Sequence, residues 1–234
     1  MKHRPLYEDA DVVAIAKPAG VTVIPARNEP PEQALHPQLE VERGERLWVV
    51  HRLDRDTSGV VLFARNASAH RALSMAFEAR DVKKTYVSWT RGVPPADSGA
   101  ITTALHTARK GKMRPALPGE ADALQSETAY RVATRAETKL GPIARVELEP
   151  RTGRQHQIRV HMRSVGAPLL VDSLYGGCDA IEANELGEAA PAIGRLTLHA
   201  ARIEFSGPSG DRRVVEAPLE EDLARLDAWL VAQS

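Results

Sequence analysis

The chain has few of the features that mark exported or membrane proteins. It contains one cysteine, Cys178, which excludes an internal disulfide bond. No apolar run reaches the length of about 18 residues that a transmembrane helix requires. The N-terminal segment MKHRP is not followed by the apolar core of a secretory signal. We therefore expect a protein of the reducing cytoplasm that does not associate with a membrane.

Net charge is also absent, because 31 Lys and Arg residues balance 31 Asp and Glu residues. A neutral sum argues mildly against nucleic-acid binding, but the distribution of charge matters more than its sum. Basic residues gather in segments 43–71, 109–114 and 145–163. One such cluster is typical of a solvated face. Three clusters together indicate a positive surface suited to RNA.

Patterns of metal ligands and of serine hydrolases are missing as well. The sequence has no CxxC pair and no HxxxH pair. His156 and His161 are separated by roughly 140° on a helix and lie on opposite faces of a strand. We expect no metal site. Ser58 lacks the G-x-S-x-G context of a nucleophilic serine.

The composition, 43% hydrophobic and 26% charged, is that of an ordinary globular protein. Helices are predicted for 66–80, for a segment ending at Gly166 and for 219–231. Short apolar runs predict strands at 11–16, 21–24, 47–50, 60–63, 85–90, 128–134, 144–148 and 196–205. Many strands with scattered helices indicate an α+β fold rather than regular βαβ alternation.

The run HRLDRDTSG, residues 51–59, carries the clearest chemical signal. It places Asp54 between Arg52 and Arg55, in a turn between two apolar strands. Such a corner can hold a catalytic side chain rigidly. Nearby guanidinium groups favour an ionised carboxylate, which suits a nucleophile or anionic stabiliser better than a general acid. A surface turn with local ion pairs is the alternative.

The segment 151–176 carries a second signal. Gly166 followed by Pro168 predicts a helix end. Before it, His156, Arg159 and Arg163 recur at helical spacing and form a basic face. Residues 152–154 lie where this helix would begin, and helix N-termini favour anions. The alternative is a core-packing helix with solvated arginines.

HRLDRDTSG resembles the catalytic motif of the RluA-type pseudouridine synthases. Four further segments resemble motifs of this family in the same order, and together they span nearly the whole chain: 17–25, 83–92, 151–176 and 196–205. Two positions depart from the family pattern. Gln155 stands where a threonine or serine is usual, and Val171 where a glycine usually precedes the aspartate.

The resemblance implies a mixed, mainly antiparallel central sheet with flanking helices and a catalytic cleft. It implies a single catalytic domain over residues 1–234, without cofactor or metal. Some relatives carry an additional N-terminal RNA-binding domain. The resemblance here begins near residue 11, so we expect no such domain in this sequence. We expect a monomer whose partner is ribosomal or transfer RNA.

The resemblance also assigns roles. Asp54 matches the essential aspartate, acting at the ribose C1′ or by promoting glycal formation. Tyr86 matches the tyrosine that stacks on the base. Arg159 matches the basic residue that pairs with the aspartate, with Arg154 as second choice. The target base must be flipped out of its stack. The residues expected to contact RNA are Arg52, which would fill the vacated position, His51, Arg55, Arg154, His156, Arg109 and Lys112.

Two other functions remain open at this stage. A nucleoside or RNA N-glycosidase also needs a carboxylate near C1′, and Asp56 is the nearest second carboxylate. It would release free base, whereas an isomerase releases none. A non-catalytic RNA-binding module is the other alternative. Loss of the motif aspartate would favour that module, and Asp54 is present.

Overall fold

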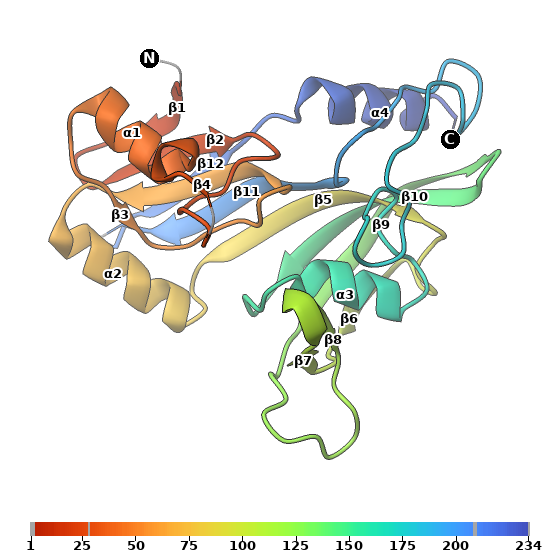
Figure 1. Cartoon of the computed structure of the whole chain (residues 1–234), viewed down its shortest axis with the longest axis horizontal. Helices are drawn as coiled ribbons and strands as arrows, with labels where there is room; N and C mark the ends of the chain where they lie inside the picture. Colours follow the sequence, from red (N-terminus) through yellow and green to blue (C-terminus); the bar gives the residue numbers. More distant parts are fainter. Residues whose placement is uncertain (1–2, 28, 208–209, 234) are drawn as a thin grey trace. The chain divides into compact units, whose positions relative to one another are not determined.

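A computed structural model describes residues 3–27, 29–207 and 210–233 (Figure 1). The chain forms two compact units. Unit 1 comprises Met1–Lys84 and His199–Pro218, and unit 2 comprises Thr85–Leu198 and Leu219–Ser234. The single catalytic domain expected from the sequence stays a prediction. Within the described ranges, no helix is long and apolar enough to cross a membrane.

Unit 1 is built on a mixed sheet. Strands β1 (Pro5–Glu8), β2 (Val12–Lys17) and β4 (Ser58–Ala64) pair antiparallel in that order. The short β3 (Trp48–Val49) also pairs antiparallel with β4. Strand β11 (Leu198–Ser206) runs parallel to β4 and antiparallel to β12 (Arg212–Glu216).

Helices cover both faces of β4. Helix α2 (Ala67–Glu78) buries Leu73 in one cluster with Val60 and Leu62. Helix α1 (Leu35–Arg43), which follows the 3-10 turn η1 (Pro31–Gln33), stacks His36 on Phe63 with ring centroids 5.9 Å apart. Because alternate residues of a strand face opposite sides, β4 is buried along its whole length.

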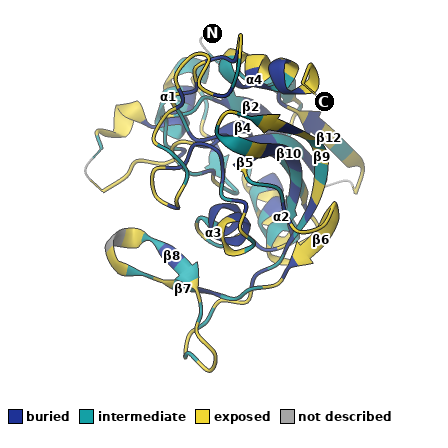
Figure 2. Cartoon of the chain, turned by 90° about the vertical axis from the view of Figure 1, so that its right-hand side faces the viewer, coloured by how far each residue is buried: buried dark blue, intermediate teal, exposed yellow. Residues whose placement is uncertain are grey.

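Unit 2 contains an antiparallel sheet and a separate hairpin. Strands β5 (Lys83–Arg91), β10 (Gly141–Pro150), β9 (Thr128–Thr138) and β6 (Ser98–Ile101) are neighbours in that order. The hairpin pairs β7 (Leu105–Thr107) with β8 (Met113–Pro115) through the 3-10 turn η2 (Arg109–Gly111). Figure 2 shows exposed residues at the tip of this hairpin.

Two helices complete unit 2. Helix α3 (Gln157–Ser164) packs Ile158 and Met162 into one cluster with Val146 and Leu148 of β10. It is largely buried (Figure 2). Helix α4 (Glu221–Val231) is fixed partly by Trp229, whose indole N–H donates to the Glu188 carbonyl at 2.9 Å.

The α+β class and the mixed, mostly antiparallel sheet are confirmed. The helix predicted at 66–80 is present as α2, and Asn66 caps it, because its side chain accepts from the Ala69 N–H at 2.8 Å. The strand predicted at 21–24 is wrong. There the Val21 carbonyl accepts from the Lys17 ammonium and the Thr22 carbonyl from the Leu35 N–H, so this backbone is committed to a loop.

Candidate active site

The predicted site residues lie in both units. Unit 1 carries His51, Arg52, Asp54 and Arg55 in the loop between β3 and β4. Unit 2 carries the others: Tyr86, Arg109, Lys112, Arg154, His156 and Arg159. The pairing of Arg159 with Asp54 that the resemblance implies stays a prediction.

Asp54 lies in the tight turn that the sequence predicts. Its carbonyl accepts from the Thr57 N–H at 3.2 Å, immediately before β4 begins. Leu53 is buried beneath the turn, while Asp54 is half-buried. The backbone is therefore fixed on both sides of the carboxylate.

Lys17 anchors this turn to the N-terminal segment. Its ammonium donates to the carbonyls of Pro18 at 2.8 Å, Val21 at 2.7 Å and Arg55 at 2.8 Å. The residue is only 1% exposed. A buried charge is tolerated where hydrogen bonds satisfy it, and three carbonyl oxygens do so here. Lys17 therefore holds residues 18–21 and the Asp54 turn together.

The start of β4 is fixed against β11 directly after the turn. The Ser58 hydroxyl lies 2.8 Å from Nδ1 of His199, and Nε2 of His199 lies 3.1 Å from the Ala217 carbonyl. A carbonyl can only accept, so His199 carries its proton on Nε2 and accepts from Ser58 through Nδ1. At Gly59, a Cβ would lie 2.2 Å from the Ala200 carbonyl oxygen.

His51 is a neutral structural group in this fold. Its Nε2 accepts from the Leu62 N–H at 2.9 Å, where the β3 ladder has ended. Its ring stacks on Phe77 of α2 at 4.8 Å between centroids. Burial, and secondly the nearby charge of Lys84, lower the pKa of His51 to about 3. His51 thus positions the loop without offering a positive charge.

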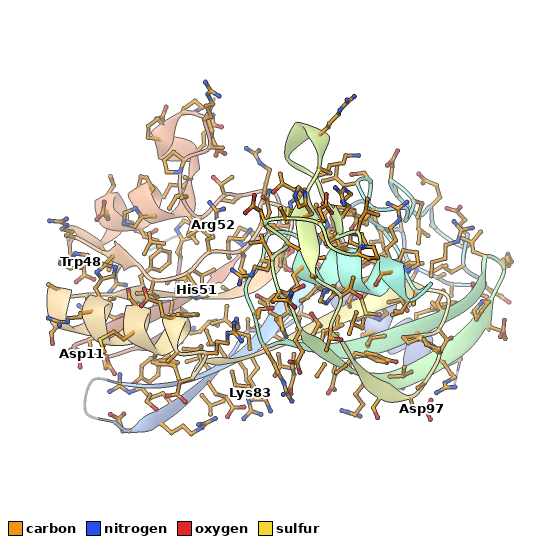
Figure 3. All side chains as sticks on the ribbon, turned by 90° about the horizontal axis from the view of Figure 1, so that it is seen from below. Asp11, Trp48, His51, Arg52, Lys83 and Asp97 are labelled. Carbon is orange, nitrogen blue, oxygen red and sulfur yellow. The ribbon has the colours of Figure 1, made fainter. Side chains whose placement is uncertain are left out.

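The two arginines beside Asp54 have different surroundings. Arg55 pairs with Glu29 at 3.0 Å. A hydrogen bond from Thr22, then one from the Ala26 N–H and the charge of Arg55, lower the pKa of Glu29. Arg52 is exposed and forms no ion pair or hydrogen bond with the residues that the structure describes. Figure 3 labels it beside His51.

In unit 2, Arg159 forms a buried, two-pronged ion pair. Its Nε lies 2.8 Å from Oδ2 of Asp172, and a terminal nitrogen lies 2.6 Å from Oδ1. The side chains are 4% and 1% exposed. Asp172 Oδ1 also accepts from the N–H groups of Leu174 and Tyr175. Arg159 is therefore a buried charge held in one orientation.

The predicted basic face of α3 is wrong in two respects. His156 precedes the helix with φ of 52°, so the helix begins at Gln157 rather than near 152–154. Arg159 is buried, and of the three predicted face residues only Arg163 is exposed. The cause is Gln157, whose side chain accepts from Thr152 and from the Arg154 N–H and keeps 152–156 in a loop.

Tyr86 lies in β5 opposite Leu148 of β10. It is half-buried and packs against the apolar cluster that contains Leu148, Ile158 and Met162. Packing of this kind fixes the orientation of the ring plane, which a ring that stacks on a base requires. Its assignment to the base stays a prediction.

Some of the remaining basic residues have a protein partner and others have no ion pair with a described residue. Arg114 pairs with Glu120, and this hydrogen bond is the main cause that lowers the pKa of Glu120 to about 2. Arg154 donates to the Gln125 carbonyl at 3.2 Å. Arg109 and Lys112 have no ion pair with any described residue. These last two fit RNA contact best.

Several organising residues escaped the sequence analysis. Lys17 and Asp172 lie inside segments that were recognised, and a lone charge within a buried apolar run was the available signal in both cases. Tyr175 and His199 gave no such signal. Lys84 is half-buried, and burial lowers its pKa. Among the described residues, no cluster of His, Cys, Asp or Glu is arranged to hold a metal ion.

Comparison with known proteins finds similarity to RNA pseudouridine synthases. The family model of RNA pseudouridylate synthase matches residues 11–164. The chain is 34% identical to ribosomal large subunit pseudouridine synthase D of Xanthomonas campestris pv. campestris, over 94% of this chain and 67% of the relative. It is 34% identical to the dual-specificity RNA pseudouridine synthase RluA of Vibrio vulnificus, over 87% and 77%.

Among solved structures, the human RNA pseudouridylate synthase domain containing 1 is similar to this chain. The TM-score is 0.76 at 25% sequence identity, with 97% of this chain and 86% of that one covered.

Proposed function

Because the chain belongs to the RNA pseudouridylate synthase family, we propose that it converts uridine in ribosomal or transfer RNA to pseudouridine through the carboxylate of Asp54. The observation that carries the proposal is the rigid turn at Asp54, fixed by Lys17 and by the Thr57 N–H. The reaction is an isomerisation, so no second substrate is consumed.

The reaction requires three changes at the uridine. The bond from N1 to the ribose C1′ breaks, the uracil turns, and C5 bonds to C1′. The proton on C5 is lost, and N1 ends with a proton, so atoms balance without a cofactor. A carboxylate serves this chemistry either as a nucleophile at C1′ or as the base that forms a glycal. Asp54 takes that role in both routes.

Arg52 is proposed to hold the RNA open. A flipped uridine leaves an unstacked gap that costs a few kcal/mol. Arg52 is exposed, adjacent to Asp54 along the chain, and not engaged by any described residue. Its planar guanidinium can stack on the flanking bases. His51 supports it by fixing the loop through the Leu62 N–H.

Arg159 and Tyr86 are proposed to complete the catalytic set. Arg159 offers a charge held by Asp172, and in this proposal it orients the carboxylate of Asp54. Tyr86 offers a ring for the flipped base and takes part in removal of the C5 proton. The proposed substrate class, ribosomal or transfer RNA, is supported by the names of similar proteins, which include a ribosomal large subunit pseudouridine synthase and a tRNA pseudouridine synthase. A cytoplasmic location accords with that substrate.

Release of tritium from RNA labelled at uridine C5 tests the proposal. Transcripts of ribosomal and transfer RNA, free of modification, are incubated with the wild type and with Asp54→Asn. We expect release by the wild type and a loss of at least about 1,000-fold in the variant, because Asn cannot act as the nucleophile or base. Filter binding of RNA should be retained.

Asp56→Asn is the matched control, since Asp56 is an exposed carboxylate in the same turn. It should release tritium like the wild type. Free uracil among the products would replace the isomerase with an N-glycosidase. Equal activity of Asp54→Asn and the wild type would remove Asp54 from the mechanism.

A further inference from the structure

One hydroxyl in unit 2 joins the β7–β8 hairpin to the start of α3. The Met113 N–H in β8 donates to the hydroxyl of Tyr175 at 2.8 Å. The same hydroxyl lies 2.7 Å from Nδ1 of His156, the residue immediately before α3. Tyr175 is only 3% exposed, so water does not readily replace either contact.

The rest of Tyr175 contacts the Arg159 ion pair. The guanidinium of Arg159 lies over the Tyr175 ring, 5.0 Å from its centroid. The Tyr175 N–H donates to Oδ1 of Asp172 at 3.2 Å. One residue therefore touches Arg159 through its ring, Asp172 through its backbone and the hairpin through its hydroxyl.

The hairpin that Tyr175 contacts carries Arg109 and Lys112, two basic residues without an ion pair to a described residue. Met113 pairs with Thr107 across the hairpin, and the turn between them contains Arg109 and Lys112. Met113, Leu105 and Tyr175 share one buried cluster with Val160 of α3. Among the described residues, the Gln155 amide also contacts the tip, donating to the Gly111 carbonyl at 3.3 Å.

We propose that the Tyr175 hydroxyl is a positioning group that holds the Arg109–Lys112 turn in register with Arg159, so that RNA bound by the hairpin is aligned with the catalytic arginine. This inference rests on the proposed function, and it requires in addition that the hairpin binds the substrate RNA. It assigns Tyr175 a role separate from the packing of its ring.

Tyr175→Phe tests the proposal, since it removes the hydroxyl and keeps the ring over Arg159. We expect the KM for RNA to rise about tenfold, the upper end for one lost buried hydrogen bond, with kcat changed by less than about twofold. Tyr130→Phe is the matched control, because Tyr130 is a buried tyrosine in β9 of the same unit. It should leave KM unchanged.

The substitution is then repeated in Arg109→Ser/Lys112→Ser. If the hydroxyl acts through the hairpin, Tyr175→Phe adds less than about twofold to the KM of that double variant. A full tenfold effect there overturns the coupling but not the role of the hairpin. A double variant with wild-type KM shows instead that the hairpin does not bind the RNA, which overturns the inference and leaves the role proposed for Asp54 unaffected.

Hydrogen exchange provides a readout that does not depend on activity. In Tyr175→Phe, the Met113 amide should exchange at least about tenfold faster than in the wild type, because its acceptor is gone. Tyr130→Phe should leave that amide protected. Unchanged exchange at Met113, or an unchanged KM in Tyr175→Phe, overturns the inference.

Discussion

The ion pair with Asp172 both stabilises the buried charge of Arg159 and fixes the orientation of its guanidinium group. Removing a guanidinium from water is costly, and the two-pronged bond to Asp172 compensates for it. Asp172 in turn is held by two backbone N–H groups. A lysine could supply the charge but not the planar pairing. The arginine at this position is therefore explained by geometry as well as by charge.

His51 should make the protein less stable in mild acid. Its pKa is lowered from 6.5 to about 3 in the fold, chiefly by burial. Between these values, the unfolded chain binds a proton that the folded chain does not. The free energy of unfolding therefore falls as pH decreases through this window, by at most about 1.4 kcal/mol per pH unit. Above pH 6.5 the effect is absent.

Urea unfolding of the wild type and of His51→Gln at pH 7 and pH 5 measures this contribution. Gln can still accept from the Leu62 N–H but does not titrate. From pH 7 to pH 5, the free energy of unfolding of the wild type should fall by about 1 to 2 kcal/mol more than that of the variant. His161, whose pKa burial also lowers, is present in both proteins and cancels. Equal losses in the two proteins would contradict the assignment.

Single residues mark the limit of what the sequence could predict. Asp54 was placed correctly in a turn because apolar runs flank it on both sides. Arg159 was expected on a basic helix face with His156 and Arg163, because periodicity records spacing and not the partner. Asp172, which buries it, follows thirteen positions later and is brought back by a turn that no local pattern specifies.

At the scale of elements, the junction of β4 and β11 limits which residues fit. Gly59 has φ of +118°, which L side chains rarely adopt, and a Cβ there would lie 2.2 Å from the Ala200 carbonyl oxygen. Gly59→Ala should lower the free energy of unfolding by at least about 2 kcal/mol. Gly153→Ala, where nothing lies within 4 Å of the added Cβ, should have little effect in the same urea titration.

If Gly59→Ala unfolded at the same urea concentration as Gly153→Ala, the close parallel contact between these strands would be refuted. The parallel pairing was not predictable from sequence, since β4 and β11 are separated by more than half of the chain. The end of α3 was predictable, because Gly166 and Pro168 act locally. Its start was not, because the side chain of Gln157 holds the preceding loop.

For the molecule as a whole, a net charge of zero makes RNA affinity depend on local clusters. Affinity should decrease steeply as salt is raised from about 50 to about 200 mM. In Arg109→Ser/Lys112→Ser, the slope of log affinity against log salt should be shallower by roughly 1 to 2. The reason is that RNA binding releases fewer counterions when phosphate contacts are lost.

Filter binding over this salt range gives the slope. Arg131→Ser is the control, since Arg131 is already paired with Glu147 at 2.6 Å. It should leave the slope unchanged. A double variant with the wild-type slope would show that phosphates are bound elsewhere on the protein.

The three carbonyl contacts of Lys17 also limit how this sequence can be recombined. They join Pro18 and Val21 to Arg55, so two segments distant along the chain share one cation. A chimera could take the Asp54 turn from a relative without that relative's matching residues 17–21. The turn would then be held by a lysine and a segment from a different protein. The two segments therefore form one unit of exchange, and evolution or design must replace them together.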